Sequence, residues 1–522
     1  MQGVQPDATL YTSTNRMKLV QLLFILLFLS TFPGLCNPEK EKDPFAFSES
    51  SFEKAKEQDQ LLFLFVGSDV CLESRNFLKE IVRDKEYFEF VKDNFVVSIM
   101  DIDLNPSLSI RYSLPTIPGF LILDAEANTY FGTTKPDKAE VLPILQTLVD
   151  KWENDRSLLQ EQLREFQDKA RQDFPTSVSQ VIDSTMNVPN HISLDLGRYI
   201  LSLDSNDRHF RQYVDQLLDW IKSENLDFVE GSFFMPRGYC TYHAEAKYSF
   251  FNFKLQEMLV DFYARTGIPA FKQTFLKSLK FLKRDLFLDT KDIFSTGYAS
   301  KKYFKMTLKE RLLYYPPSPR RSDLALSQVV YLKILYKIQH LMNKGRIDPS
   351  EVEFLKEHLQ RKLSYFAYMT DKYQREDGLL YFTSAREFTN FETQVEFFAL
   401  LQLMQKIEEV KEEVFLRKMT NLYESFFKTF YDERSELFSD IPLNHFEDRP
   451  KMYQYSLYFT REHARLLLFL DFLHLKTGES KYKNLKTQIQ KTVSMHDQKY
   501  PHRFYWMMWY HNLNSRKSQV EK

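Results

Sequence analysis

Apolar residues in the first third of the chain gather in short continuous runs, with helical patterns between them. The runs cover residues 61–66, 95–100 and 119–123, and the helical patterns cover 51–58 and 72–92. Continuous apolar strands that alternate with helices are typical of a sheet with both faces covered. The pattern therefore predicts an α/β unit in this part of the chain.

From residue 150 onward the apolar residues follow helical spacing, and no strand run is predicted beyond residue 190. A charged segment at 151–174 predicts a solvated connecting helix. Short turns at 266–269 and 477–479 are typical of connections within helical hairpins. Five pairs of helical segments are predicted: 190–203 with 206–223, 247–266 with 268–286, 322–343 with 348–371, 389–406 with 411–430, and 456–476 with 479–494.

Four loops after the second helix of a hairpin share one pattern, an acidic residue followed by an apolar or aromatic residue. They lie at 227–233, 289–295, 377–381 and 432–439. A pattern that recurs in this way indicates a repeat architecture, either a closed α/α toroid or an open helical solenoid. We favour the toroid, because the loops leave the same end of successive hairpins and can converge on one face.

A targeting signal is predicted at the N-terminus, where Met17 and Lys18 precede an apolar run at 19–32. A run of this length suits a signal peptide better than a membrane span of about 20 residues. Gly34 and Cys36 fit a cleavage site after Cys36, with Met17 as the start. We therefore expect an exported protein, periplasmic or extracellular, although an uncleaved anchor and lipidation remain alternatives.

Composition changes this picture in three respects. The 70 basic and 71 acidic residues give a net charge of -1, which indicates no nucleic-acid partner. Only 13 glycines occur, while 15% of residues are aromatic, which favours helices over turn-rich β architecture. After cleavage only Cys71 and Cys240 would remain, in different predicted domains, so their spacing predicts no disulfide.

Cys71 lies where the first apolar strand turns into a helix. The positive end of a helix dipole lowers a thiol pKa and so suits a nucleophile. Ser74 occupies the position of a resolving thiol. Cys71 is therefore predicted to capture a partner thiol or attack a disulfide without resolving itself; an inert thiol is the alternative. Pro118 precedes a strand and is a candidate cis peptide beside this site, with a trans proline as the alternative.

Residues 51–133 resemble the thioredoxin-like domain of the uncharacterised family that includes the spermatogenesis-associated thioredoxin-like proteins. Gly67, Cys71 and the dipeptide at 100–101 match its pattern, and residues 129–131 resemble its Thr-Tyr-Phe. Ser74 departs from the second cysteine of the family. The resemblance implies a thioredoxin-like fold and brings no settled reaction with it.

The same resemblance implies that the chain continues into an α/α toroid of the six-hairpin glycosidase type. The family's His-Phe-Glu-Lys-Met-Leu-Tyr-Asp stretch is matched best by residues 308–315, which keep Glu310, Leu313 and Tyr314. Because the family's His and Asp are missing, an activity shared with its toroid is in doubt. The fold class is thus an N-terminal α/β thioredoxin-like domain followed by an all-α toroid of (α/α)6 type.

Glycoside hydrolysis would need two carboxylates that face each other across a cleft. Acidic residues at helix ends also serve as caps, which is the alternative. No metal site is predicted, since Cys240, His243 and Glu245 form a single weak cluster, and no cofactor is expected. The candidate toroid residues are Asp227, Glu230, Asp289, Asp292, Glu310, Asp377 and Asp432, with Glu387 and Asp440 as further loop carboxylates.

The predicted organisation is a leader at 1–36, a thioredoxin-like domain at 37–150, a connecting helical segment at 151–189 and a toroid at 190–515. Our leading interpretation is an exported protein that binds client protein thiols or disulfides through Cys71. A carbohydrate-binding or glycosidase-like toroid with a vestigial thioredoxin domain is the alternative, and a non-catalytic scaffold comes third. Glycan is thus a second candidate partner, enzymatic activity stays open, and no integral membrane domain is expected after signal removal.

Overall fold

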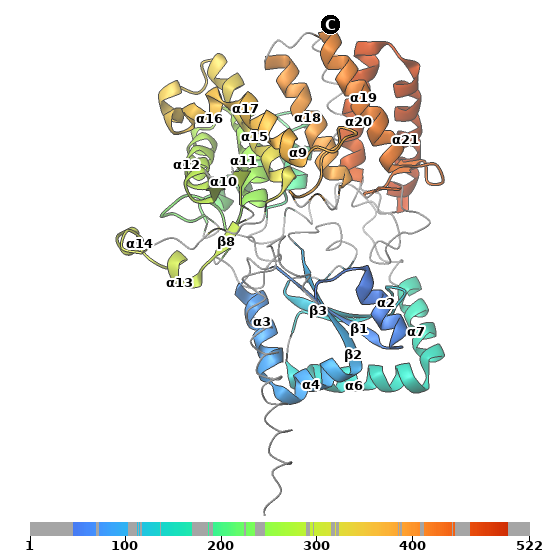
Figure 1. The fold of residues 1–522 in the computed structure, drawn as a ribbon. Helices are drawn as coiled ribbons and strands as arrows, with labels where there is room; N and C mark the ends of the chain where they lie inside the picture. Colours follow the sequence, from blue (N-terminus) through green and yellow to red (C-terminus); the bar gives the residue numbers. More distant parts are fainter. Residues whose placement is uncertain are drawn as a thin grey trace, which may run out of the picture.

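The structure is a computed structural model, shown in Figure 1. The predicted leader, its cleavage site and Cys71 lie outside the described residues, and so do Asp289, Asp292 and Glu387. The structure describes residues 45–68, 72–102, 112, 114, 117–135, 137–169, 186, 192–223, 226–234, 246–288, 293–295, 297–314, 319, 323–384, 386, 389–407, 412–440, 442–443 and 460–499.

The N-terminal part contains a four-stranded sheet in the order β2-β1-β3-β4. β1 pairs in parallel with β2 and antiparallel with β3, which pairs antiparallel with β4. The predicted strands are therefore confirmed, and residues 129–131 begin a fourth. The bounds are β1 (Leu61–Gly67), β2 (Phe95–Asp101), β3 (Gly119–Leu123) and β4 (Thr129–Thr133).

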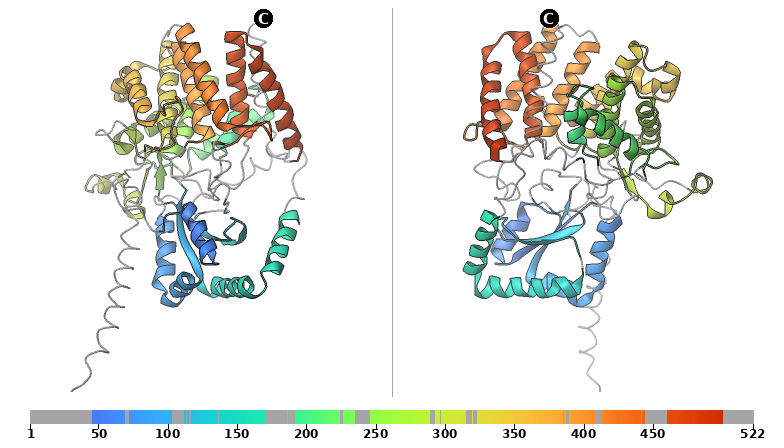
Figure 2. Two further views of the ribbon diagram at one scale, coloured as in Figure 1. Left: turned by 45° about the vertical axis from the view of Figure 1, so that its right-hand side comes forward. Right: turned by 180° about the vertical axis from the view of Figure 1, so that it is seen from behind.

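Both faces of this sheet are covered, as its apolar strands predict. Alternate residues of β1 point to opposite faces, so Phe63 joins one apolar cluster and Leu64 joins another. Helices flank the sheet in Figures 1 and 2. They are α2 (Glu49–Glu57), α3 (Leu72–Arg83), α4 (Lys85–Asn94) and α6 (Lys138–Asn154).

Two predicted helices differ from the structure in their ends. The expected single helix at 72–92 is two helices, because the Asp84 carboxylate accepts a hydrogen bond from the Tyr87 N–H at 3.0 Å and starts α4 there. The connecting segment is also divided at Asp155, between α6 and α7 (Arg156–Lys169). α6 belongs to the sheet domain, since Trp152 donates to the Asp59 carbonyl oxygen at 3.0 Å.

The C-terminal part contains five helical hairpins within its described residues, and these correspond to the five predicted pairs. In each hairpin the first helix lies toward the centre and the second lies outside. The inner helices are α9 (Leu194–Ile200), α11 (Ser249–Thr266), α15 (Ala325–Asn343), α18 (Phe391–Ile407) and α20 (Thr460–Thr477), and the outer ones are α10 (Arg208–Trp220), α12 (Pro269–Leu286), α17 (Lys362–Tyr373), α19 (Glu412–Phe430) and α21 (Ser480–Lys499).

The inner helices form a closed ring. Consecutive inner helices pack against one another from α9 through α20. The circle closes between the last and the first, where Arg461 Nη1 of α20 lies 3.4 Å from Asp195 Oδ2 of α9. α11 and α15 are buried on nearly all sides, which explains why their sequences are apolar all round. These contacts therefore arrange the hairpins as a toroid.

Short strands between the hairpins correct the prediction that no strand occurs beyond residue 190. Runs of two or three residues are too short to produce a recognisable apolar pattern. α13 (Lys301–Phe304) and α14 (Leu308–Arg311) follow them, and a 3-10 helix (Pro349–Leu355) and α16 (Lys356–Gln360) precede α17. The strands pair as β5 (Ala246–Tyr248) with β8 (Gly297–Ala299), β6 (Phe287–Leu288) with β7 (Ile293–Phe294), and β9 (Tyr431–Asp432) with β10 (Leu437–Phe438).

Candidate functional site

The inner helices begin at the end of the ring that faces the sheet domain (Figures 1 and 2). Charged residues near these helix starts meet in what we call the mouth cluster: Asp195, Lys254, Glu392, Arg461 and Glu462. Arg461 is its centre, with Nη1 3.4 Å from Asp195, Nη2 3.0 Å from Glu392 and Nε 2.6 Å from Glu462. Lys254 donates a second hydrogen bond to Glu392. Two glutamates thus share one guanidinium.

A second group of charges lies deeper in the ring, and each inner helix contributes one member. This axis cluster consists of Arg198, Glu257, Lys333, Glu396 and Arg465. Lys333 Nζ lies 2.6 Å from Glu257 and 2.5 Å from Glu396, while Arg198 lies 3.0 Å from Glu257 and Arg465 pairs with Glu396. Every side chain of the cluster is at most 14% exposed. Buried ion pairs therefore fill the ring interior below the mouth cluster.

The two glutamates of the mouth cluster titrate far apart. Burial raises the pKa of Glu462 to about 7, and the charge of Glu392 adds to this effect while Arg461 opposes it. Burial would raise the pKa of Glu392 as well, but Arg461 and Lys254 outweigh it and lower that pKa to about 2. At neutral pH one carboxyl group is therefore ionised, while the other lies close to its own pKa.

One oxygen of Glu462 is buried without a hydrogen-bond partner among the described residues. The side chain is 1% exposed, and its Oε2 has no hydrogen-bond partner within the described part of the chain. A buried polar atom without a partner is costly and is often kept for a function. Two carboxyl groups whose pKa values are pushed apart are the arrangement that general acid and base catalysis requires.

The structure brings together two of the predicted loop carboxylates, Asp227 and Glu230. Asp227 Oδ2 accepts hydrogen bonds from Lys247 Nζ at 2.5 Å and from Arg311 Nη1 at 2.7 Å. Glu230 accepts from Arg311 at 2.8 Å and from Tyr303 at 3.0 Å. Burial lowers the pKa of the fully enclosed Lys247 to about 8, against the opposing charge of Asp227. These groups satisfy one another and hold a loop in place.

The other described candidates from the loops do not converge. Glu310 accepts hydrogen bonds from the backbone and hydroxyl of Thr307, and Asp377 accepts from the backbone of Leu379. Asp432 accepts from the backbone of Arg434 in the same manner. Each carboxylate therefore stabilises its own turn, which is the capping alternative. Their predicted binding role stays a prediction.

The predicted thiol site is described only in part. Ser74 is buried, and its hydroxyl accepts a hydrogen bond from the Ser68 N–H at 3.1 Å. The Ile117–Pro118 peptide is cis, as expected. Val66 pairs with Gly119, so the end of β1 lies beside the start of β3. Cys71 itself lies outside the described residues.

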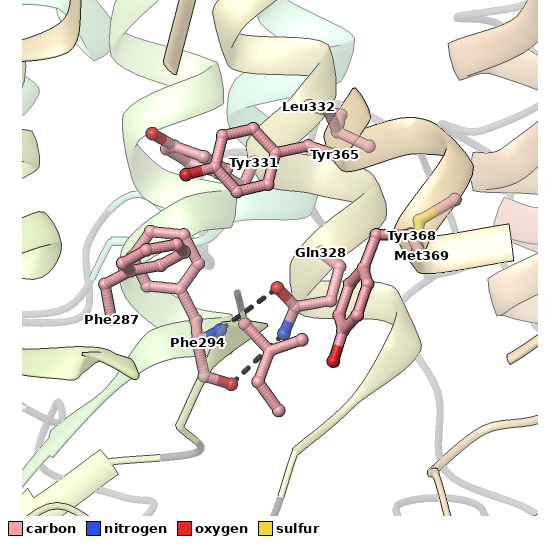
Figure 3. A pocket seen from close by; sticks show the side chains of 9 residues that line it. Phe287, Phe294, Gln328, Tyr331, Leu332, Tyr365, Tyr368 and Met369 are labelled. Carbon is pink, nitrogen blue, oxygen red and sulfur yellow. Dashed lines mark hydrogen bonds between the residues drawn. The ribbon is translucent and has the colours of Figure 1, made fainter. Parts of the chain in front are cut away.

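An aromatic pocket lies beside α15 (Figure 3). Its cavity volume is only about 10 Å³, roughly the space of one water molecule. The amide of Gln328, which points into it, exchanges two hydrogen bonds with the backbone of Phe294. The Tyr331 hydroxyl lies 2.6 Å from Nδ1 of His358. Burial lowers the pKa of this histidine to about 4. The lining contains no charged side chain: Phe287, Ile293, Phe294, Gln328, Tyr331, Leu332, Tyr365, Tyr368 and Met369.

The mouth and axis clusters were missed by the sequence analysis, which looked for acids in loops. A usable signal was present within the helices. Glu392 and Glu396 lie four residues apart in an otherwise apolar segment, and so do Lys333 and Lys337. Residues at this spacing share one helix face. Charges on one face of an apolar helix indicate buried ion pairs or a site.

No described helix is long and apolar enough to cross a membrane. Within the same residues, no group of three or more histidine, cysteine or acidic side chains has a geometry suited to a metal ion.

Comparisons with known proteins give distant structural similarity only. No family model matches the chain, and no curated protein matches it. Cellobiose 2-epimerase from Bacillus thermoamylovorans is similar with a TM-score of 0.44 and 9% identity, over 58% of this chain and 75% of that chain. A D-mannose isomerase is similar with a TM-score of 0.42 and 10% identity, over 60% of this chain and 84% of that chain. A glycoside hydrolase family 76 mannosidase from Bacteroides thetaiotaomicron is similar with a TM-score of 0.37 and 12% identity, over 56% of this chain and 71% of that chain.

At these scores the similarity supports no statement about activity. The closed ring of helical hairpins rests instead on the contacts between the inner helices. The predicted thioredoxin-domain family stays a prediction, because no comparison names it.

Proposed function

We propose that the helical ring is a carbohydrate-acting, glycosidase-like domain whose acid–base pair is Glu462 and Glu392. The observation that carries this proposal is that two carboxylates bind the same arginine in unlike surroundings: Glu392 is also bound by Lys254, whereas Oε2 of Glu462 is buried without a hydrogen-bond partner in the described part of the chain. This geometry raises the pKa of Glu462 and lowers that of Glu392. Glycoside hydrolysis uses such a pair, in which one carboxyl group donates a proton and the other acts as a carboxylate. The sequence predicts this function as an alternative, with the candidate acids in the loops. The acids proposed here lie on the inner helices instead.

The proposed roles follow from the environment of each group. Glu462 supplies the proton that the oxygen of the leaving sugar takes up as the glycosidic C–O bond breaks; because Oε2 is buried, this step requires the mouth cluster to open around the sugar. Glu392 stays ionised and stabilises the positive charge that develops on the sugar ring, or activates the incoming water. Arg461 touches both carboxylates and positions them. The net reaction adds one water molecule across the glycosidic bond and releases two sugars.

The direct test is hydrolysis of a panel of aryl glycosides and oligosaccharides by the purified full chain. Glu462→Gln and Glu392→Gln should each reduce kcat by at least about 100-fold on any substrate that is turned over. Glu413→Gln is a matched control, because Glu413 is exposed on the outer helix α19. Activity that survives both substitutions in the mouth cluster would contradict the assignment of the pair.

A second candidate function, thiol capture through Cys71, is favoured by the strand arrangement of the sheet domain. A parallel β1–β2 unit is followed by an antiparallel β3–β4 pair, and the register of Val66 with Gly119 brings the end of β1 to the start of β3. This supports a thioredoxin-like domain, in which the segment that contains Cys71 would leave β1 beside Pro118. An exported location, as the leader predicts, would suit this role.

The pH dependence of alkylation tests this second function. In the full chain, Cys71 should react with a thiol pKa clearly below the ~8.5 of a free cysteine. Cys71→Ala should remove that reactive component, whereas Cys240→Ala should keep it. A component that titrates normally, or that persists in Cys71→Ala, would exclude Cys71 as an activated nucleophile.

A further inference from the structure

An arm formed by residues 301–314 stands out from the side of the helical domain in all views (Figures 1 and 2). It contains α13 and α14 and includes three consecutive apolar residues at 312–314. Leu312 is 77% exposed, Leu313 is 83% exposed and Tyr314 is 52% exposed. Large apolar side chains that are exposed together mark an interaction site more often than scattered ones do.

The base of the arm is firmly held. The Arg311 side chain is 3% exposed and donates hydrogen bonds to Asp227 at 2.7 Å, to Glu230 at 2.8 Å and to the Phe304 carbonyl oxygen at 2.8 Å. Tyr303 is also buried and donates to Glu230 at 3.0 Å. Because these contacts fix the last turn of α14, the adjacent leucines are presented outward rather than folded onto the domain.

The exposed charges of the arm are mostly positive. Lys302, Lys305 and Lys309 are exposed, and none has a carboxylate partner in the described part of the chain. The Lys302 ammonium lies 5.6 Å from the Tyr314 ring, so basic and apolar groups adjoin at the tip. The one acidic residue, Glu310, is bound to the backbone and hydroxyl of Thr307.

We infer that this arm docks on an anionic lipid bilayer. Exposed leucines and a tyrosine beside unpaired lysines match the chemistry of a membrane interface, where apolar side chains insert and lysines contact lipid phosphates. Three apolar side chains are far fewer than the roughly 20–30 residues that a stable protein interface uses on each side. The proposal is independent of the function assigned to the mouth cluster, and it makes the cluster of Asp227, Glu230 and Arg311 the anchor of a membrane contact.

The test is cosedimentation of the full chain with vesicles of phosphatidylcholine, either alone or mixed with phosphatidylglycerol. We expect binding to the mixed vesicles that weakens with added salt. The double variant Leu312→Ser, Leu313→Ser should bind at least ten-fold more weakly. Lys305→Gln and Lys309→Gln should each weaken binding about five-fold, from about 1 kcal/mol per lysine.

Leu475→Ser is the matched control, because Leu475 is 75% exposed on α20, outside the arm. It should bind as the unsubstituted chain does. All the substituted side chains are exposed, so unchanged circular dichroism and unchanged Tm should show that the variants fold. The inference is overturned if the chain does not sediment with the mixed vesicles, or if Leu475→Ser weakens binding as much as the double variant. It is equally overturned if the double variant instead abolishes self-association of the chain without vesicles.

Discussion

Arg461 of α20 lies 3.4 Å from Asp195 of α9, across 266 residues of sequence. This contact joins the last described inner helix to the first. The same guanidinium holds Glu392 and Glu462, so the residue that closes the ring also organises the candidate acid–base pair. Arg461 therefore contributes both to ring closure and to the geometry of the site.

Arg461→Ala should be strongly destabilising. It removes the cation that Asp195, Glu392 and Glu462 share and, among the described residues, leaves Glu392 with Lys254 alone. Removal of one partner from a buried ion pair costs about 3–5 kcal/mol. Urea denaturation followed by circular dichroism measures the loss. Lys481→Ala is the control, because Lys481 pairs with Glu424 and Glu479 at the surface and should cost at most about 1 kcal/mol. Equal costs for the two variants would show that the mouth cluster does not hold the ring.

The free energy of unfolding should fall between pH 4.5 and 7 because of Glu462. Its pKa is about 7 in the folded chain and near 4.5 when unfolded. The folded state therefore binds more protons in this window, and the stabilisation present below pH 4.5 is lost as the pH rises through 7. The free energy of unfolding falls by about 3 kcal/mol at most across this pH range.

Glu462→Gln should abolish this part of the pH dependence, and the exposed control Glu413→Gln should retain it. Denaturation midpoints measured at a series of pH values separate the two variants. A pH profile of Glu462→Gln that coincides with that of the unsubstituted chain would show that Glu462 is ionised throughout.

Lys333 and Glu396 should be energetically coupled. Their side chains lie 2.5 Å apart and are 6% and 1% exposed. Lys333→Met or Glu396→Gln alone leaves a buried charge with fewer partners, at a cost of several kcal/mol. The double variant should cost less than the sum of the two, with a coupling of about 1–3 kcal/mol in a double-mutant cycle. Additive costs would mean that the axis cluster is not one network.

Gly297→Ala should destabilise the β5–β8 pair that carries Lys247. The backbone at Gly297 has a φ of 156°, and an added Cβ would lie 2.2 Å from the Lys247 carbonyl oxygen. Gly345→Ala is the control, since φ there is 66° and nothing lies within 4 Å of the added atom. Strain alone costs about 1–2 kcal/mol at Gly345. Thermal denaturation should show a larger loss for Gly297→Ala, and an equal loss would contradict the clash.

Much of the architecture could be predicted because local signals agree with the fold. The turn at Gly267 ends α11 with a φ of 72°, and that at Gly478 follows α20 with a φ of 71°, so glycine marks these hairpins directly. Helix ends set by a single cap were harder to predict. Asp84 interrupts a pattern that remains amphipathic on both sides, and the break depends on one side-chain hydrogen bond.

The candidate site could not be predicted for a different reason. Glu392 and Glu462 lie on different helices, α18 and α20, and meet only because these two helices pack side by side. Acidic residues in loops, such as Asp377, gave a local pattern that was easier to recognise but that stabilises turns. Helical spacing identifies which face a charge lies on, while its partner is decided by tertiary packing.

The central claim is that Glu462 is protonated when Glu392 is ionised. Difference infrared spectroscopy of the full chain tests it directly, because only a protonated carboxyl group gives a carboxylic-acid C=O band. We expect such a band at pH 5.5 to 6 that disappears with a midpoint near pH 7 and is absent from Glu462→Gln. A spectrum without this band, or one in which the band is unchanged in Glu462→Gln, would contradict the assignment.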